Sequence, residues 1–260
     1  MESTIALKSY LEAQYEKYAV SEFIVDDPIQ IPYRFKKQQD IEIAGFFAAI
    51  FAWGRRDIII KKTTLLMELM DYEPYEFIKN AKPKELQKLI DFKHRTFQFI
   101  DLDYFLKCFQ IHFQKWNSLE PAFGGTIFSN DASIFNHLNY FNHYLRELSP
   151  IPDRTIKHIP NPAKGAAAKR LCMYSRWMIR KDAIDFGIWK TIQSSQLVIP
   201  LDVHVINTAL KLKIIEENDK PNWNTSIKIT EFLKQLDPKD PIKYDLALFG
   251  MGVERGKNEK

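Results

Sequence analysis

The chain has 260 residues, of which 45% are hydrophobic and 27% are charged, the balance of an ordinary soluble globular protein of one or two domains. Its two cysteines exclude a disulfide framework and a four-cysteine metal or iron–sulfur site. The net charge of +4 permits nucleic-acid binding without arguing for it. No apolar run is long enough to span a membrane, and the first four residues lack signal-peptide features, so we expect a cytoplasmic protein.

Apolar residues recur at helical spacing through most of the chain, which predicts an all-α fold of about ten or more helices. In chain order, the expected helices span residues 4–19, 39–53, 57–70, 74–80, 83–91, 101–117, 131–147, 165–180, 185–194, 203–213, 225–236 and 240–253. No alternating strand pattern of convincing length is found. We expect a single globular unit with approximate lobes at 39–150 and at 1–38 plus 151–254, and a flexible tail at 255–260.

The segment 199–205 (IPLDVHV) places an acidic residue just before a predicted helix. Asp202 follows a proline-containing entry, so its carboxylate can accept backbone N–H groups and stay ionised at the positive helix terminus. The ordinary interpretation is a plain N-cap, and the functional one is a catalytic carboxylate.

Residues 164–181 combine a small-residue helix start with several basic side chains. Exposed N–H groups at such a start favour an anion such as phosphate. Lys169 and Arg176 are seven residues apart and share a helix face with Arg180 nearby, while Trp177 can pack or stack. The alternative is a solvated basic face on a core helix.

A turn at 53–57 carries Trp53, Arg55 and Arg56 between two predicted helices. Such residues contact phosphates or enter a base stack, although a surface turn with a buried tryptophan has the same composition. No common nucleotide, serine-hydrolase or metalloprotease motif occurs, and the histidines show no ligand spacing, so we expect no metal and no cofactor. Cys108 and Cys172 lie among apolar neighbours and are expected in the core.

Together these segments resemble known families. The run LDVHV at 201–205 resembles the aspartate segment of the helix-hairpin-helix DNA glycosylases, the endonuclease III superfamily. Residues 41–62 resemble its early helix and DNA-facing turn, and residues 243–252 its closing helix. The whole chain also resembles a family of uncharacterised bacterial proteins through its DPIxIP, AWG, HRTF (94–97), KRLxMxxRWMIR (169–180) and PLDVH motifs.

The superfamily resemblance implies a two-lobed all-α enzyme that flips a damaged base from duplex DNA and cleaves its glycosidic bond. It implies that Asp202 supports the chemistry and that Lys169 is the nucleophile, with Lys164 and Lys181 as alternatives. The Lys169–Asp202 spacing is similar to that of archaeal 8-oxoguanine DNA glycosylases, which suggests an oxidised purine as substrate. A lysine nucleophile must be neutral when it attacks.

The predicted DNA-binding and base-pocket residues complete this hypothesis. Phosphate contacts are expected from Arg55, Arg56, Arg154, Lys157, Lys164, Arg176 and Arg180. Base-pocket candidates are Trp53, Trp177, Phe186, Trp189 and His204. The expected partner is double-stranded DNA with a damaged base, bound by a monomer. The hairpin segment 159–165 has one glycine where the superfamily has two, and Asn207 replaces an arginine. These departures motivate an alternative, a non-catalytic DNA- or structured-RNA-binding protein, with a helical protein-interaction scaffold as a third possibility.

Overall fold

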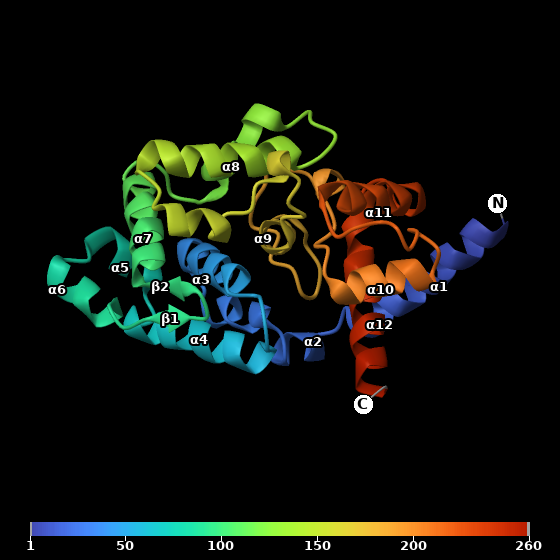
Figure 1. Cartoon of the computed structure of the whole chain (residues 1–260), viewed down its shortest axis with the longest axis horizontal. Coiled ribbons are helices and arrows are strands. Elements are labelled where there is room, and N and C mark those ends of the chain that lie inside the picture. The colour runs from blue at the N-terminus through green and yellow to red at the C-terminus, as the bar shows by residue number, and fades with distance from the viewer. Residues whose placement is uncertain (1, 259–260) are drawn as a thin grey trace. The chain divides into compact units, whose positions relative to one another are not determined.

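The computed structural model describes residues 2–258. Most of the described chain is helical, and its strands are limited to one two-stranded antiparallel hairpin (Figure 1). The all-α prediction is therefore confirmed. The chain divides into two compact units. Unit 1 comprises Met1–Phe23, Ser129–Asn136 and Asn161–Lys260, and unit 2 comprises Ile24–Phe128 and His137–Pro160.

Unit 1 contains the chain's first helix and its last four. These are α1 (Glu2–Tyr18), α9 (Lys169–Ile179), α10 (Val203–Lys211), α11 (Trp223–Leu236) and α12 (Tyr244–Asn258). Helix α12 packs against both α1 and α10 (Figure 1). Two glycines permit these close contacts. Gly250 abuts the Tyr18 ring, and a Cβ at Gly252 would lie 2.7 Å from the Cβ of His204.

Unit 2 contains the middle of the chain. Its elements are α3 (Gln38–Ile50), α4 (Arg56–Leu69), α5 (Pro74–Asn80), α6 (Pro83–Leu86), β1 (Lys93–His94), β2 (Phe97–Gln98) and α7 (Phe99–Phe113). Two further helices, α2 (Glu22–Val25) and α8 (Phe135–Leu148), cross the unit boundaries. The apolar segment expected to be a buried helix is α3. The ring of Phe46 packs edge-on against Phe105 and Phe109, at centroid distances of 5.2 and 5.0 Å.

The prediction of a helix at 185–194 is wrong. Phe186 N and Trp189 N donate to carbonyl groups at the end of α9, so the backbone is held by hydrogen bonds to another helix. Gly187 adopts a left-handed conformation (φ +58°), which also interrupts a helix. The hairpin β1–β2 was not predicted, because two-residue strands are too short to give an alternating pattern. Residues 255–258, expected in a tail, continue α12, and 259–260 lie outside the described residues.

Candidate active site

The candidate active site lies in unit 1, where the first residue of α9 meets the residue that caps α10. Lys169 Nζ is 3.2 Å from Asp202 Oδ2. The lysine side chain is 33% exposed and the aspartate side chain 10%. The structure thus brings together the two residues for which the superfamily resemblance implies a catalytic role, although they are 33 residues apart in the chain.

The two oxygens of the Asp202 carboxylate have different partners. Oδ1 accepts hydrogen bonds from His204 N (2.9 Å) and Val205 N (3.0 Å), which makes Asp202 the N-cap of α10. Oδ2 faces Lys169. The capping geometry therefore fixes the carboxylate so that one oxygen is directed at the amine. The capping and functional interpretations of this residue are compatible.

An unusual backbone leads into Lys169. Asn161 caps a short 3-10 helix (Pro162–Lys164), which ends at Gly165 in a left-handed conformation (φ +81°). Ala168, the residue before the helix, is also left-handed (φ +50°) and does not cap α9 with its side chain. This conformation costs a residue with a Cβ about 1–2 kcal/mol. Helix α9 consequently begins at Lys169, four residues later than predicted, with its lysine at the first helical position.

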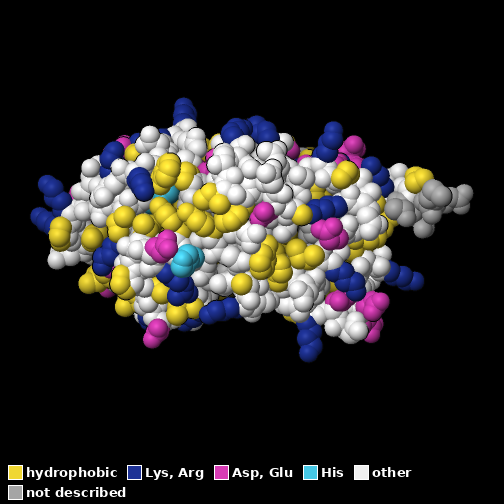
Figure 2. Space-filling view, turned by 90° about the horizontal axis from the view of Figure 1, so that it is seen from above, with side chains coloured by type: hydrophobic (Ala, Val, Ile, Leu, Met, Phe, Trp, Pro, Cys, Tyr) yellow, Lys and Arg dark blue, Asp and Glu magenta, His cyan; other side chains and the backbone are white. Residues whose placement is uncertain are grey.

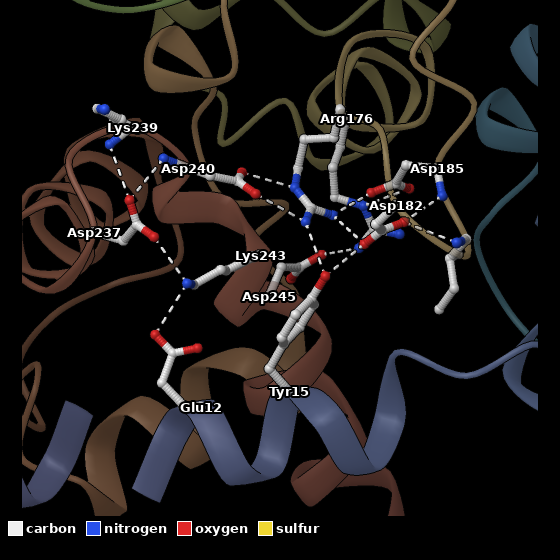
Figure 3. A network of polar contacts seen from close by, with 12 residues as sticks. Glu12, Tyr15, Arg176, Asp182, Asp185, Asp237, Lys239, Asp240, Lys243 and Asp245 are labelled. Atoms are coloured by element: carbon white, nitrogen blue, oxygen red, sulfur yellow. Dashed lines mark hydrogen bonds and ion pairs between the residues drawn. The ribbon is translucent and has the colours of Figure 1, made fainter. Parts of the chain in front are cut away.

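Arg176, two turns further along α9, is buried in the core of unit 1. Its Nε lies 3.2 Å from Asp185 Oδ1, and its Nη1 donates to Asp245 Oδ2 (Figure 3). Only 6% of its side chain is exposed. Both carboxylates come from outside α9, one from the loop after it and one from α12.

Arg180, just after the last turn of α9, extends this network. Its Nε lies 2.8 Å from Asp240 Oδ1, and its Nη1 contacts Asp182 at 2.8 Å as well as Asp185. Tyr15 OH donates to Asp182 Oδ2 at 3.0 Å, which ties α1 to the same network. Two buried guanidinium groups and four aspartates thus form one cluster, which we call the arginine–aspartate network; Asp240 is its partly exposed member.

The arginine–aspartate network is electrostatically linked to the candidate active site. Burial raises the pKa of Asp185 and of Asp245 to about 6, and the guanidinium groups offset this only in part. The charge of Asp202 also contributes to the raised pKa of Asp245. A buried carboxyl therefore lies within electrostatic range of the carboxylate that pairs with Lys169.

The prediction that Arg176 and Arg180 contact phosphates is wrong. Their side chains are 6% and 1% exposed and their guanidinium groups are ion-paired with buried carboxylates, so neither faces a ligand in solvent. The spacing of Lys169 and Arg176 correctly placed both on one helix, but α9 runs into the core and ends at Ile179, just before Arg180. The apolar residues around Arg176 in the sequence could have indicated that it is buried. A buried arginine needs carboxylate partners, so burial would have predicted an ion pair in place of a phosphate contact. The partner aspartates themselves were not predicted.

The base-pocket candidates in unit 1 differ in exposure. Trp177 and Trp189 are 1% exposed and belong to the core, so neither offers an open face to a base. Phe186 and His204 are partly exposed. His204 follows Asp202 on α10 and packs edge-on against Phe249, with centroids 5.6 Å apart.

Of the alternative nucleophiles, Lys164 and Lys181 are both exposed. Within residues 2–258, no carboxylate lies within ion-pair distance of either. Lys181 forms an isolated backbone bridge with Phe186. Lys169 is therefore the one of the three lysines that is held beside an aspartate.

Two of the four predicted DNA-binding residues of unit 2, Arg55 and Arg154, form ion pairs within the unit. The exposed Arg55 pairs with Asp57 at 2.6 Å, and Arg56 is partly exposed. Arg154 binds the buried carboxylate of Asp101 at 3.1 Å, and Lys157 is exposed. Arg154 therefore has a structural role in addition to any role in binding.

Trp53, the base-pocket candidate of unit 2, is partly exposed. It stacks on His158 with ring centroids 5.6 Å apart and planes inclined by 25°. The His94 and Trp53 rings also meet in a T-shaped arrangement, with centroids 5.0 Å apart. Its ring is therefore supported from within the unit.

Lys and Arg side chains are dispersed over the face shown in Figure 2, among hydrophobic, acidic and other side chains. Within the described part of the chain, no group of three or more His, Cys, Asp or Glu side chains is arranged to hold a metal ion. No helix among residues 2–258 combines the length and the apolar character that crossing a bilayer requires.

Comparison with protein families places the chain in one of them. A family described as "Protein of unknown function (DUF2400)" matches residues 27–254. The match covers most of the chain, so the chain belongs to this family. No curated protein and no solved structure matches it.

Proposed function

We propose that this protein is a helix-hairpin-helix DNA glycosylase with AP-lyase activity, in which Lys169 is the nucleophile and Asp202 accepts its proton. The observation that carries the proposal is the 3.2 Å distance between Lys169 Nζ and Asp202 Oδ2. The proposed partner is double-stranded DNA with a damaged base, and an oxidised purine is the first substrate to test. The proposal includes the two-lobed fold of that superfamily, a monomer and a cytoplasmic location.

The chemistry begins with a proton transfer. The Lys169 ammonium gives a proton to Asp202 Oδ2, and the resulting amine attacks C1′ of the deoxyribose. A C–N bond forms, the glycosidic bond breaks, and its electron pair leaves with the base, which takes up the proton held by Asp202. The secondary ammonium on the sugar then returns a proton to Asp202, and the nitrogen lone pair opens the ring by breaking the C1′–O4′ bond. The bond's electron pair goes to O4′, which takes up the proton from Asp202, and a protonated imine remains. Borohydride reduces this imine to a stable amine.

The geometry of Asp202 suits this role. Because two backbone N–H groups hold Oδ1, the carboxylate cannot rotate freely, and Oδ2 stays directed at Lys169. The N-terminus of α10 stabilises negative charge on the carboxylate. This charge favours the second role of Asp202, which is to stabilise positive charge developing on the sugar, over its proton uptake. The base must be extruded first, at a cost of a few kcal/mol that is smallest for a mispaired or damaged base.

The test is covalent trapping with borohydride on duplexes that contain 8-oxoguanine or an abasic site. We expect an adduct with the wild type, none with Lys169→Gln, and an unchanged adduct with Lys211→Gln, an exposed lysine of α10 that serves as the control. Loss of the adduct in Lys164→Gln or Lys181→Gln instead would reassign the nucleophile. Absence of a wild-type adduct on every lesion, with salt-dependent binding retained, would point to the non-catalytic binding protein. No nucleic-acid affinity at low salt would point to a protein-interaction scaffold.

A further inference from the structure

The HRTF motif at 94–97, which the proposed reaction does not use, forms the hairpin of unit 2. Strand β1 pairs antiparallel with β2, with Lys93 opposite Gln98 and His94 opposite Phe97. The residues of the turn are Arg95 and Thr96. Arg95 has a left-handed backbone (φ +53°), which is uncommon for a residue other than glycine.

Two side chains of the motif anchor the hairpin to the core. His94 is 1% exposed and its Nε2 lies 3.0 Å from the carbonyl oxygen of Phe51. Phe97 is fully buried and packs edge-on against the Phe51 ring at 5.0 Å. At the turn, Arg154 Nη2 donates to Thr96 O at 2.8 Å. The backbone of the turn is thus fixed on both sides.

The remaining side chain, Arg95, is exposed and lies over Gly54. A Cβ at Gly54 would overlap the Arg95 guanidinium, with its Cζ at 3.5 Å. Gly54 belongs to the turn that follows Trp53, whose ring is supported by His158. The hairpin therefore places a cation next to the turn at 53–57, for which the sequence predicts phosphate contacts.

The charge around Arg95 is positive. Burial lowers the pKa of His94, and the positive charges of Arg95 and Lys62 lower it further, so both cations lie near a neutral imidazole. For Arg95 and Lys62, the described residues provide no carboxylate within ion-pair distance. The neighbouring Arg55, in contrast, is paired with Asp57.

We propose that Arg95, presented by the β1–β2 hairpin over Gly54, binds a phosphate of a nucleic-acid backbone, with Lys62 adding to the local positive charge. A guanidinium matches the planar, multidentate geometry of a phosphate. The anchored residues on both sides hold Arg95 in its left-handed conformation. The position of its side chain over Gly54 is therefore set by the hairpin. This inference rests on the nucleic-acid partner of the proposed function, but it does not require bond cleavage.

The experiment measures the affinity for a fluorescein-labelled undamaged DNA duplex by anisotropy between about 50 and about 200 mM KCl. Each phosphate contact contributes a slope of about −0.9 to log K against log salt concentration. We expect Arg95→Gln to lose one contact, which makes its slope less steep by about 0.9. The factor by which salt weakens its affinity over this range should therefore be about threefold smaller than the factor for the wild type. Lys79→Gln, which removes one exposed charge from α5, is the matched control and is expected to keep the wild-type slope.

Arg95→Lys keeps the charge and is expected to restore the slope, which separates phosphate binding from a structural role. Thermal unfolding of each variant checks that the hairpin is retained. An Arg95→Gln slope equal to that of the wild type overturns the inference, even if the wild type forms a trapped adduct. A reduced slope in a protein that forms no adduct supports the inference while the glycosylase proposal fails. A wild type without affinity at low salt overturns both.

Discussion

Helix α9 carries its basic residues in two contrasting environments. At its first residue, Lys169 is 33% exposed and has a single carboxylate beside it. Two turns later Arg176, and directly after the helix Arg180, are almost fully buried, and between them they contact four aspartates, of which Asp185 pairs with both. One helix therefore supplies both a side chain that can meet a substrate and side chains that hold its own unit together. Helical spacing identifies the shared face, but the depth of each position depends on how the helix enters the core.

The two environments differ in their energetics. A partly exposed ion pair contributes about 0–1 kcal/mol, because water screens the charges. Removing one partner from a buried pair costs about 3–5 kcal/mol, because the other charge stays in a medium that solvates it poorly. Substitutions at the two ends of α9 should therefore affect different properties, with chemistry changing at Lys169 and stability at the arginines.

The largest expected effect is at Arg176. In Arg176→Met, the buried carboxylate of Asp245 loses its guanidinium partner, and the buried carboxylate of Asp185 keeps only Arg180. We expect the free energy of unfolding to fall by about 3–5 kcal/mol. Urea denaturation followed by circular dichroism measures this loss.

Lys181→Gln is the matched control, because it removes a positive charge from the exposed residue next to Arg180. We expect it to change the free energy of unfolding by about 0.5 kcal/mol or less. If Arg176→Met proved as stable as Lys181→Gln, the contrast between the two ends of α9 would be lost.

A smaller effect is expected from the titration of Asp245. Its folded-state pKa of about 6 exceeds the pKa of an unfolded aspartate, about 3.9. The folded protein therefore takes up a proton first as the pH falls through 6, and this uptake stabilises it progressively down to about pH 4. From pH 7 to pH 5, protonation of Asp245 adds about 1 kcal/mol to the stability of the wild type, and Asp245→Asn lacks this gain.

Urea denaturation of both proteins at pH 5, 6 and 7 gives this difference. His94 and His112, whose pKa values burial lowers, change stability in the opposite direction, but they do so in both proteins and cancel. Glu217→Gln, an exposed carboxyl of the same unit, is expected to follow the wild-type profile. A wild type and Asp245→Asn with parallel profiles would contradict a titration of Asp245 near pH 6.

Much of the fold was predictable because helical periodicity survives without tertiary context. Helix α5 matches its predicted range of 74–80, and α3 was expected as a buried apolar helix. Asp202 was predictable as a cap because an acidic residue before a helix has a local physical role. Its pairing with Lys169 was suggested by family resemblance, since nothing local in either segment specifies a contact across 33 residues.

The errors arose where a tertiary contact overrides the local pattern. The segment 185–194 has helical composition, but its backbone groups bind the end of α9. Trp177 was ambiguous between stacking and packing, and only the burial of α9 decides for packing. The aspartates that neutralise Arg180 come from separate segments, at 182–185 and 240, and no spacing rule connects them.

The smallest expected effect separates the two roles of Asp202. Asp202→Ala removes the cap of α10 and should cost about 1 kcal/mol, whereas Asp202→Asn keeps a capping oxygen and should stay within about 0.5 kcal/mol of the wild type. Both should abolish the trapped adduct, since neither accepts a proton from Lys169. Asn222, which caps α11 by accepting from Thr225 N at 3.1 Å, provides the control.

Asn222→Ala should lose a similar amount of stability and still form the adduct, because the Asn222 side chain accepts from Thr225 and takes no part in the Lys169–Asp202 pair. Asp202→Asn with full stability and no adduct would show that the carboxylate acts on Lys169 and not only on the helix. An adduct that survives in Asp202→Asn would leave Asp202 as a cap alone. Lys169 would then need another proton acceptor. The two ends of α9 would differ in the burial of their side chains, but the carboxylate beside Lys169 would have no part in the chemistry.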